Sequence, residues 1–225
     1  MFTGFPRDGL RFLDELARNN ERAWFLARKE RFERTLAEPM RAFVAAPRAA
    51  LHAAGIPIGG NARRSIFRFY RDVRFAADKR PYNTHLAAYL SYDGERTTQG
   101  GLYVHVEPRD SHFSIAFYRI ERPMLQRWRA SMAHSPARFR RVLASLERNG
   151  LSLTGPEGSE DALTRMPRGF EGYADSPLAP YFRLRHFTVR RSLGARDIGS
   201  PKLVAQSVDF VRAAKPLLDF GWSLV

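Results

Sequence analysis

The 225-residue chain contains no cysteine, which excludes disulfides, thiolate metal sites and a cysteine nucleophile. It also lacks any hydrophobic run approaching the ~20 residues that a membrane-spanning helix needs. The N-terminus has no basic region followed by an apolar stretch, so we expect no signal peptide. These absences predict a cytoplasmic protein without a membrane partner. Hydrophobic residues make up 44% of the chain, which excludes a disordered chain.

Lysine is scarce as well: it accounts for only four of the 37 basic residues, and the other 33 are arginine. The codon usage of a GC-rich genome explains a preference for arginine over lysine. It does not explain the excess of 37 basic over 23 acidic residues, which gives a formal net charge of +14. This excess favours anionic partners, of which nucleic acid is the broadest class.

Residues 1–55 show helical periodicity, and Asn20 is placed to cap a helix that contains Trp24 and Phe25. Strand patterns follow at 66–70, 84–92, 102–107 and 113–120, within a core sheet predicted over 64–120. Helices are expected over 123–150, and a strand and a final helix over 183–220. Runs of helices that flank a run of strands predict an α+β fold with a mainly antiparallel sheet and helices packed on one face. With no linker evident, we expect a single domain over 1–225.

The clearest pair of strands is 102–107 with 113–120. A four-residue loop over 108–111 pairs Val106 with Phe113 and separates two faces. The apolar face comprises Leu102, Val104, Val106, Phe113, Ile115 and Phe117. The polar face comprises Tyr103, His105, Glu107, His112, Ser114 and Tyr118. We expect the apolar face to lie against the helices.

Residues 63–80 contain seven basic and two acidic side chains, the densest charge cluster in the chain. If the strand at 66–70 continues, Arg68, Asp72 and Arg74 share one face, and the guanidiniums keep donor edges for a phosphate or carboxylate. The polar strand residues Tyr103 and His105 complete a pocket in this interpretation. The predicted ligand-binding residues are Arg68, Arg71, Asp72, Arg74, Asp78, Lys79, Tyr82, Asn83, Tyr103 and His105. A second basic run extends from 183 to 196 without an acid, partly on a predicted edge strand.

A family resemblance rests on Asn19-Asn20, Trp24-Phe25, Phe67-Arg68, Arg71 to Phe75, Asp78-Lys79, Pro81 to Asn83, Gly101 to Val106, Leu125 with Trp128-Arg129, and Met166 to Phe170. These segments resemble a widespread, mainly bacterial family of conserved hypothetical proteins, catalogued as domain-of-unknown-function family 2461. The resemblance covers nearly the whole chain and implies a single-domain protein without an established activity. Asn83 stands where the family often has lysine and Ala76 where it often has serine, so roles that need that amine or hydroxyl do not carry over.

Three functions are compatible with the motif. The first is binding of a phosphorylated or otherwise anionic small ligand, with a broad nucleic-acid surface less favoured. The second is a structural or interaction role, in which Arg–Asp pairs hold a loop on the sheet. The third is an enzyme with Lys79 or His105 as the base. Arginine or lysine beside Asp72 and Asp78 would lower their pKa, which makes them poor general acids.

His105, Glu107 and His112 on one face offer the nitrogen and oxygen donors of a metal site. Polar side chains on the solvent face of a sheet explain the same pattern, and a slip of one residue in the strand pairing would separate the three. We therefore expect no metal and no cofactor.

Overall fold

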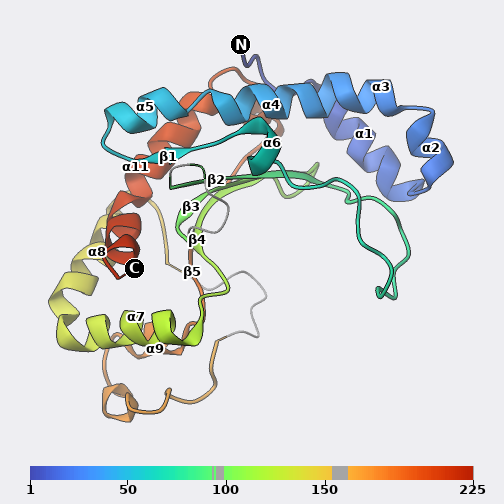
Figure 1. Cartoon of the computed structure of the whole chain (residues 1–225). Coiled ribbons are helices and arrows are strands. Elements are labelled where there is room, and N and C mark those ends of the chain that lie inside the picture. Colours follow the sequence, from blue (N-terminus) through green and yellow to red (C-terminus); the bar gives the residue numbers. More distant parts are fainter. Residues whose placement is uncertain (93, 95–98, 154–161, 225) are drawn as a thin grey trace.

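The computed structural model describes residues 1–92, 94, 99–153 and 162–224. Five strands form one antiparallel sheet in the order of the sequence (Figure 1). They are β1 (Ile58–Gly59), β2 (Leu86–Tyr92), β3 (Gly101–Val106), β4 (His112–Phe117) and β5 (Phe187–Ser192). The antiparallel sheet with helices before, between and after its strands confirms the predicted α+β class.

Helices form three groups along the chain. The first group precedes β2 and contains α1 (Arg7–Arg18), α2 (Arg22–Leu26), α3 (Lys29–Phe32), a π-helical turn (Glu33–Ala37), α4 (Glu38–Ala45), α5 (Arg48–Ala53) and α6 (Ala62–Ser65). The second lies between β4 and β5 and contains α7 (Arg122–His134), α8 (Pro136–Arg148), a 3-10 turn (Glu171–Tyr173) and α9 (Ala179–Arg183). The third contains α10 (Ala195–Ile198) and α11 (Leu203–Trp222). In the described part of the chain, none of these helices has the length and apolar character to cross a bilayer.

Helices α4, α7 and α11 cover one face of the sheet (Figure 1). Phe113 of β4 stacks between Phe43 of α4 and Phe210 of α11, with ring centroids 6.2 and 5.9 Å apart. Trp128 of α7 stacks on Phe187 of β5 at 4.0 Å. Burial of these large aromatic side chains from three helices against one face helps to hold the helices to the sheet.

The strand register differs from the predicted one by two residues, because Val104 rather than Val106 lies opposite Phe113. Side chains alternate between faces with a period of two, so a shift by an even number leaves every side chain on its predicted face. All six residues of the predicted apolar face are buried. The shift brings His105 directly opposite His112, where Glu107 was predicted.

The predicted strand at 66–70 is wrong. Ile66 and Tyr70 make only isolated bridges, to Ala88 and Tyr82 respectively. Residues 66–70 do adopt an extended backbone. Their pairing partner changes within these five residues, from β2 at Ile66 to residues 81–83, where the chain returns toward β2, at Tyr70. Residues 69–83 therefore fold back on themselves as an arm that projects beyond the sheet on the side of α1 and α2 (Figure 1).

Gly221 in α11 allows the last turn of this helix to lie directly on the sheet. A Cβ at this position would overlap the ring of Phe117, which is buried in β4. We expect Gly221→Ala to lower the free energy of unfolding by about 1–3 kcal/mol through overpacking, outweighing the roughly 1 kcal/mol that alanine gains in helix propensity. Urea unfolding of the variant measures the change. Gly172→Ala, where nothing lies within 4 Å of the added Cβ, is the matched control; a Gly221→Ala protein at least as stable as the parent would contradict this packing.

Candidate functional site

The base of the arm is fixed to the N-terminal helices by Asn20 and Tyr82. The Asn20 side-chain amide donates to the Tyr82 carbonyl at 2.9 Å and accepts from its backbone N–H at 3.0 Å, so it pairs with Tyr82 as a neighbouring strand would. The buried Tyr82 ring stacks on Phe25 at 4.2 Å. Asn20 is therefore not the predicted helix cap, since Glu21 occupies that position in α2. Its amide satisfies backbone groups of the arm instead.

The acidic residues of the arm are bound to its own arginines. Asp78 contacts Arg80 at 2.8 Å and Arg71 at 2.7 Å, and Asp72 contacts Arg74 at 2.7 Å. Hydrogen bonds from Arg80, and then from Arg71, hold the pKa of Asp78 well below its ordinary value. The pKa of Asp72 is lowered by hydrogen bonds from Arg74. Both carboxylates stay ionised at neutral pH, which agrees with the expectation that neither is a good general acid.

The remaining predicted arm residues bond mainly to backbone. Lys79 Nζ donates to the carbonyls of Val73 at 3.1 Å and Arg74 at 3.3 Å. Asn83 Nδ2 donates to the Arg68 carbonyl at 3.1 Å. Because no strand continues through 71–80, the prediction that Arg68, Asp72 and Arg74 share a strand face is wrong. Of these cations, Arg68 alone has a side chain that makes no hydrogen bond or ion pair within the described residues.

Tyr103 and His105 lie on the sheet, on the face opposite the helices. Tyr103 Oη and His105 Nδ1 are 3.1 Å apart, and His105 Nε2 is 2.9 Å from Glu107 Oε2. A carboxylate only accepts, so Nε2–H donates to Glu107 and Nδ1 accepts from the Tyr103 hydroxyl. Burial lowers the pKa of His105, against the opposing hydrogen bond of Glu107, and raises the pKa of Tyr103 to about 12. The chain of three side chains therefore holds a neutral, oriented imidazole.

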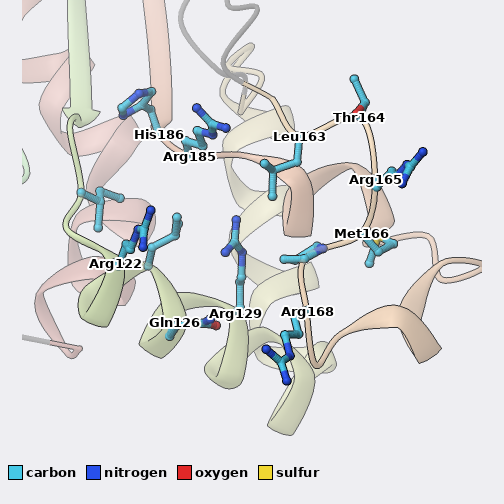
Figure 2. A pocket seen from close by; sticks show the side chains of 13 residues that line it. Arg122, Gln126, Arg129, Leu163, Thr164, Arg165, Met166, Arg168, Arg185 and His186 are labelled. Atoms are coloured by element: carbon cyan, nitrogen blue, oxygen red, sulfur yellow. The ribbon is translucent and has the colours of Figure 1, made fainter.

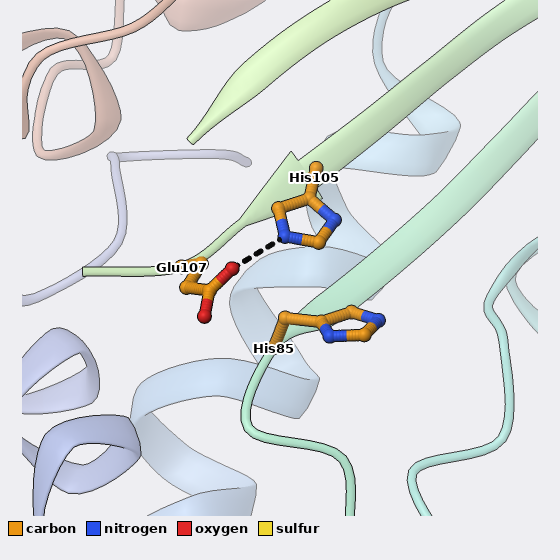
Figure 3. Close-up of side chains that lie close together, drawn as sticks. All are labelled: His85, His105 and Glu107. Carbon is orange, nitrogen blue, oxygen red and sulfur yellow. Dashed lines mark hydrogen bonds and ion pairs between the residues drawn. The ribbon is translucent and has the colours of Figure 1, made fainter. Parts of the chain in front are cut away.

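Two further histidines flank His105. The ring of His85 stacks on one side at 4.4 Å and that of His112 on the other at 4.8 Å (His85, His105 and Glu107 are drawn in Figure 3). Burial also lowers the pKa of His85. The sequence pattern groups His105 and Glu107 with His112 but not with His85, which lies between the arm and β2. The sequence places His85 only two residues beyond the predicted ligand-binding residue Asn83. It does not reveal the β2–β3 register that brings His85 beside His105 and Glu107.

A cavity of about 730 Å³ lies between α7, residues 163–168 and the chain entering β5 (Figure 2). Its described lining contains five arginines and no carboxylate, together with apolar residues such as Leu125, Leu163 and Met166. We call it the arginine pocket; its arginines are Arg122, Arg129, Arg165, Arg168 and Arg185. None of the ten predicted ligand-binding residues lines it.

Arg129 is the central side chain of the arginine pocket. It is only 5% exposed, and it rises from α7 toward Arg185, whereas Arg165 points outward (Figure 2). Arg129 Nε donates to the Phe182 carbonyl at 2.9 Å and Nη2 reaches the Leu184 carbonyl at 3.4 Å. Burial, and then the like charge of Arg185, lower its pKa. Within the described residues no carboxylate contacts Arg122, Arg129 or Arg185, so a buried positive charge stands beside two others without a counter-ion.

The sequence held partial signals for this pocket. Residues 183–196 contain no acid, and both Arg129 and Met166-Pro167-Arg168 belong to the segments that carry the family resemblance. These segments are separated by some tens of residues, and periodicity within each gives no distance between them. The tertiary fold alone brings them together.

The pairing of Asn20 with Tyr82 predicts a specific loss of stability. Asn20→Ala leaves the backbone N–H and carbonyl of the buried Tyr82 without this partner, which costs about 1–3 kcal/mol. The measurement is thermal or urea unfolding. The neighbouring Asn19→Ala is the matched control, because the exposed Asn19 side-chain amide donates to the nearby Glu15 carbonyl of α1 and, among the described residues, to no other group. Equal effects of Asn19→Ala and Asn20→Ala would contradict the anchoring role.

Asp72→Ala should leave the unfolding midpoint unchanged, because the ion pair of Asp72 with Arg74 is local and exposed.

One comparison with known proteins is positive. A family model described as conserved hypothetical protein (DUF2461) matches residues 8–220. No curated protein and no solved structure matches the chain. The matched range includes α1 to α11 almost completely, the arm, all five strands and both arginine-bearing walls of the pocket. The chain therefore belongs to the DUF2461 family of conserved hypothetical proteins.

Proposed function

We propose that this protein binds a small organic anion, such as a phosphorylated metabolite or a polycarboxylate, in the arginine pocket. A volume of about 730 Å³ is in the range of cavities that enclose small-molecule ligands. Guanidiniums favour phosphate and carboxylate groups because their paired N–H donors match two oxygens. The apolar residues Leu125, Leu163 and Met166 suit a ligand that carries a carbon skeleton as well as charge.

Arg129 is the observation that carries this proposal. A buried charge that has no counter-ion among the described residues is costly, and a bound anion would reduce this cost. Two carbonyls fix the guanidinium through Nε and Nη2, so its orientation is set before a ligand arrives. A bound anion would offset the mutual repulsion of Arg129 and Arg185. Binding would therefore draw on electrostatic energy already stored in the fold.

The pocket is favoured over the arm as the anion site because of what surrounds the arginines. In the arm, Asp72 and Asp78 already occupy Arg74, Arg71 and Arg80. In the pocket, the described lining offers no competing carboxylate. In the arm an anion would have to displace an ion pair, whereas in the pocket it would meet guanidiniums that contact no carboxylate of the described residues.

Calorimetric titration with inorganic phosphate, pyrophosphate and citrate tests the proposal and separates phosphate from carboxylate recognition. We expect Arg122→Gln and Arg185→Gln each to weaken binding about ten- to a hundredfold, since a charge-assisted hydrogen bond contributes roughly 1.5–3 kcal/mol. Both residues are exposed and unpaired within the described residues, so neither change should disturb folding. Arg129→Lys, which keeps the charge and loses the planar fork, should weaken pyrophosphate binding as well.

Arg140→Gln with Arg141→Gln in α8 is the matched control, because it removes two exposed arginines outside the pocket lining. This double variant should bind as the parent does. If it weakens binding as much as the pocket variants do, the attraction is a general property of the basic surface. Binding of an oligonucleotide that falls steeply with salt and ignores the pocket variants would favour the nucleic-acid alternative.

A structural role for the arm motif is the second candidate. The reciprocal amide pairing of Asn20 with Tyr82, and the bridge of Asp78 to Arg71 across the arm, favour it. On this interpretation the motif holds the arm against the N-terminal helices and needs no ligand. It is compatible with anion binding in the pocket, because the two involve different residues.

A further inference from the structure

The polar ends of β2 and β3 bring three potential metal ligands onto one face. Ala87 pairs with His105 and Leu86 with Val106, so continuing this antiparallel register by one residue places His85 opposite Glu107. Directly opposed residues have Cβ atoms about 4.5–5.5 Å apart. His105 and Glu107 are two residues apart on the same strand and therefore share a face. The backbone thus sets a compact triangle of two imidazoles and one carboxylate.

The donor atoms of this triangle converge. One ligand atom from each of His85, His105 and Glu107 lies within 4.8 Å of the others (Figure 3). Tetrahedral ligands around an ion with bonds of about 2.1 Å lie roughly 3.4 Å apart, so small side-chain rotations would close the site. We propose that His85, His105 and Glu107 bind a divalent first-row transition metal such as Zn²⁺. This site is independent of the proposed anion pocket.

The donor set determines the kind of metal. Two imidazole nitrogens and a carboxylate oxygen suit Zn²⁺ or Fe²⁺, whereas Ca²⁺ and Mg²⁺ prefer oxygen ligands alone. Three protein ligands leave at least one coordination position for water or a further ligand. The side chain of Glu107 is one-third exposed, which gives an ion access from solvent.

Tyr103 would act as an outer partner of the site. Metal binding at His105 Nε2 replaces the proton that this nitrogen donates to Glu107, so the proton of the neutral ring moves to Nδ1. That N–H then donates to Tyr103 Oη, which already lies 3.1 Å away. A second ring nitrogen held by a polar group is the usual arrangement of metal-binding histidine. Tyr103 therefore positions the ligand without contacting the ion.

The metal site and the arginine pocket lie at opposite ends of the sheet, the first at β2 and β3 and the second beside β4 and β5. His112 pairs with Ser192 near the triangle, and Phe117 pairs with Phe187 beside the residues that enter the pocket. The two pairs are five residue steps apart along the strand, which corresponds to about 17 Å. Substitutions at one site can therefore be used without disturbing the other.

Chelator-stripped protein titrated with Zn²⁺ against a chromophoric chelator tests the proposal. We expect one equivalent of Zn²⁺ to bind the parent, and His105→Ala and Glu107→Gln to abolish that equivalent. Tyr103→Phe should weaken binding about 10- to 100-fold. Titration with Co²⁺ gives a second readout, because its visible absorption bands report nitrogen and oxygen ligation of low symmetry. His85→Gln, at a position outside the strand ladder, should remove these bands even if His105→Ala fails to fold.

His52→Ala is the matched control, because it removes an exposed histidine of α5 outside the triangle. This variant should bind Zn²⁺ as the parent does, and circular dichroism should show that every variant used is folded. The proposal is overturned if the parent binds no Zn²⁺. It is equally overturned if folded His85→Gln and Glu107→Gln proteins retain the parent's affinity and Co²⁺ spectrum.

Discussion

The antiparallel register of β2, β3 and β4 is the constraint on which the other features depend. It turns Val104, Phe113 and Ile115 toward α4, α7 and α11, where their burial holds the helices to the sheet. The same alternation necessarily turns Tyr103 and His105 to the other face. Burial of the apolar face therefore also fixes which polar side chains gather on the opposite face, because side chains alternate along each strand.

The arginines of the arm and those of the arginine pocket differ in whether a carboxylate contacts them. In the arm, Asp72 and Asp78 form ion pairs with Arg71, Arg74 and Arg80, so three guanidiniums of the densest basic motif already have a carboxylate partner. In the arginine pocket, Arg129 is buried with carbonyl partners and no carboxylate among the described residues. Local charge density thus does not show which guanidiniums are available to an anion. What matters is whether the guanidiniums are already paired, and pairing depends on neighbours that sequence distance does not reveal.

The family-like residues around Asn20 and Tyr82 have a clear physical role in the fold. The amide of Asn20 supplies a donor and an acceptor to the backbone of a buried tyrosine, and Phe25 covers the ring. A side chain that replaces a strand partner allows the arm to leave the sheet without leaving buried backbone groups unsatisfied. The arm is consequently fixed at its base, whereas its outer part is held by exposed ion pairs.

The sequence by itself determined the α+β class, the two faces of the β3–β4 pair and the edge position of β5, because side-chain period and turn residues are local properties. It misjudged the strand at 66–70 and the role of Asn20, since both depend on which distant segment supplies the hydrogen-bond partner. Only the tertiary structure brought His85 to His105 and Glu107, and Arg129 to Arg185. Such sites are formed by side chains from segments far apart in the chain, and packing of the whole fold sets the distances between them.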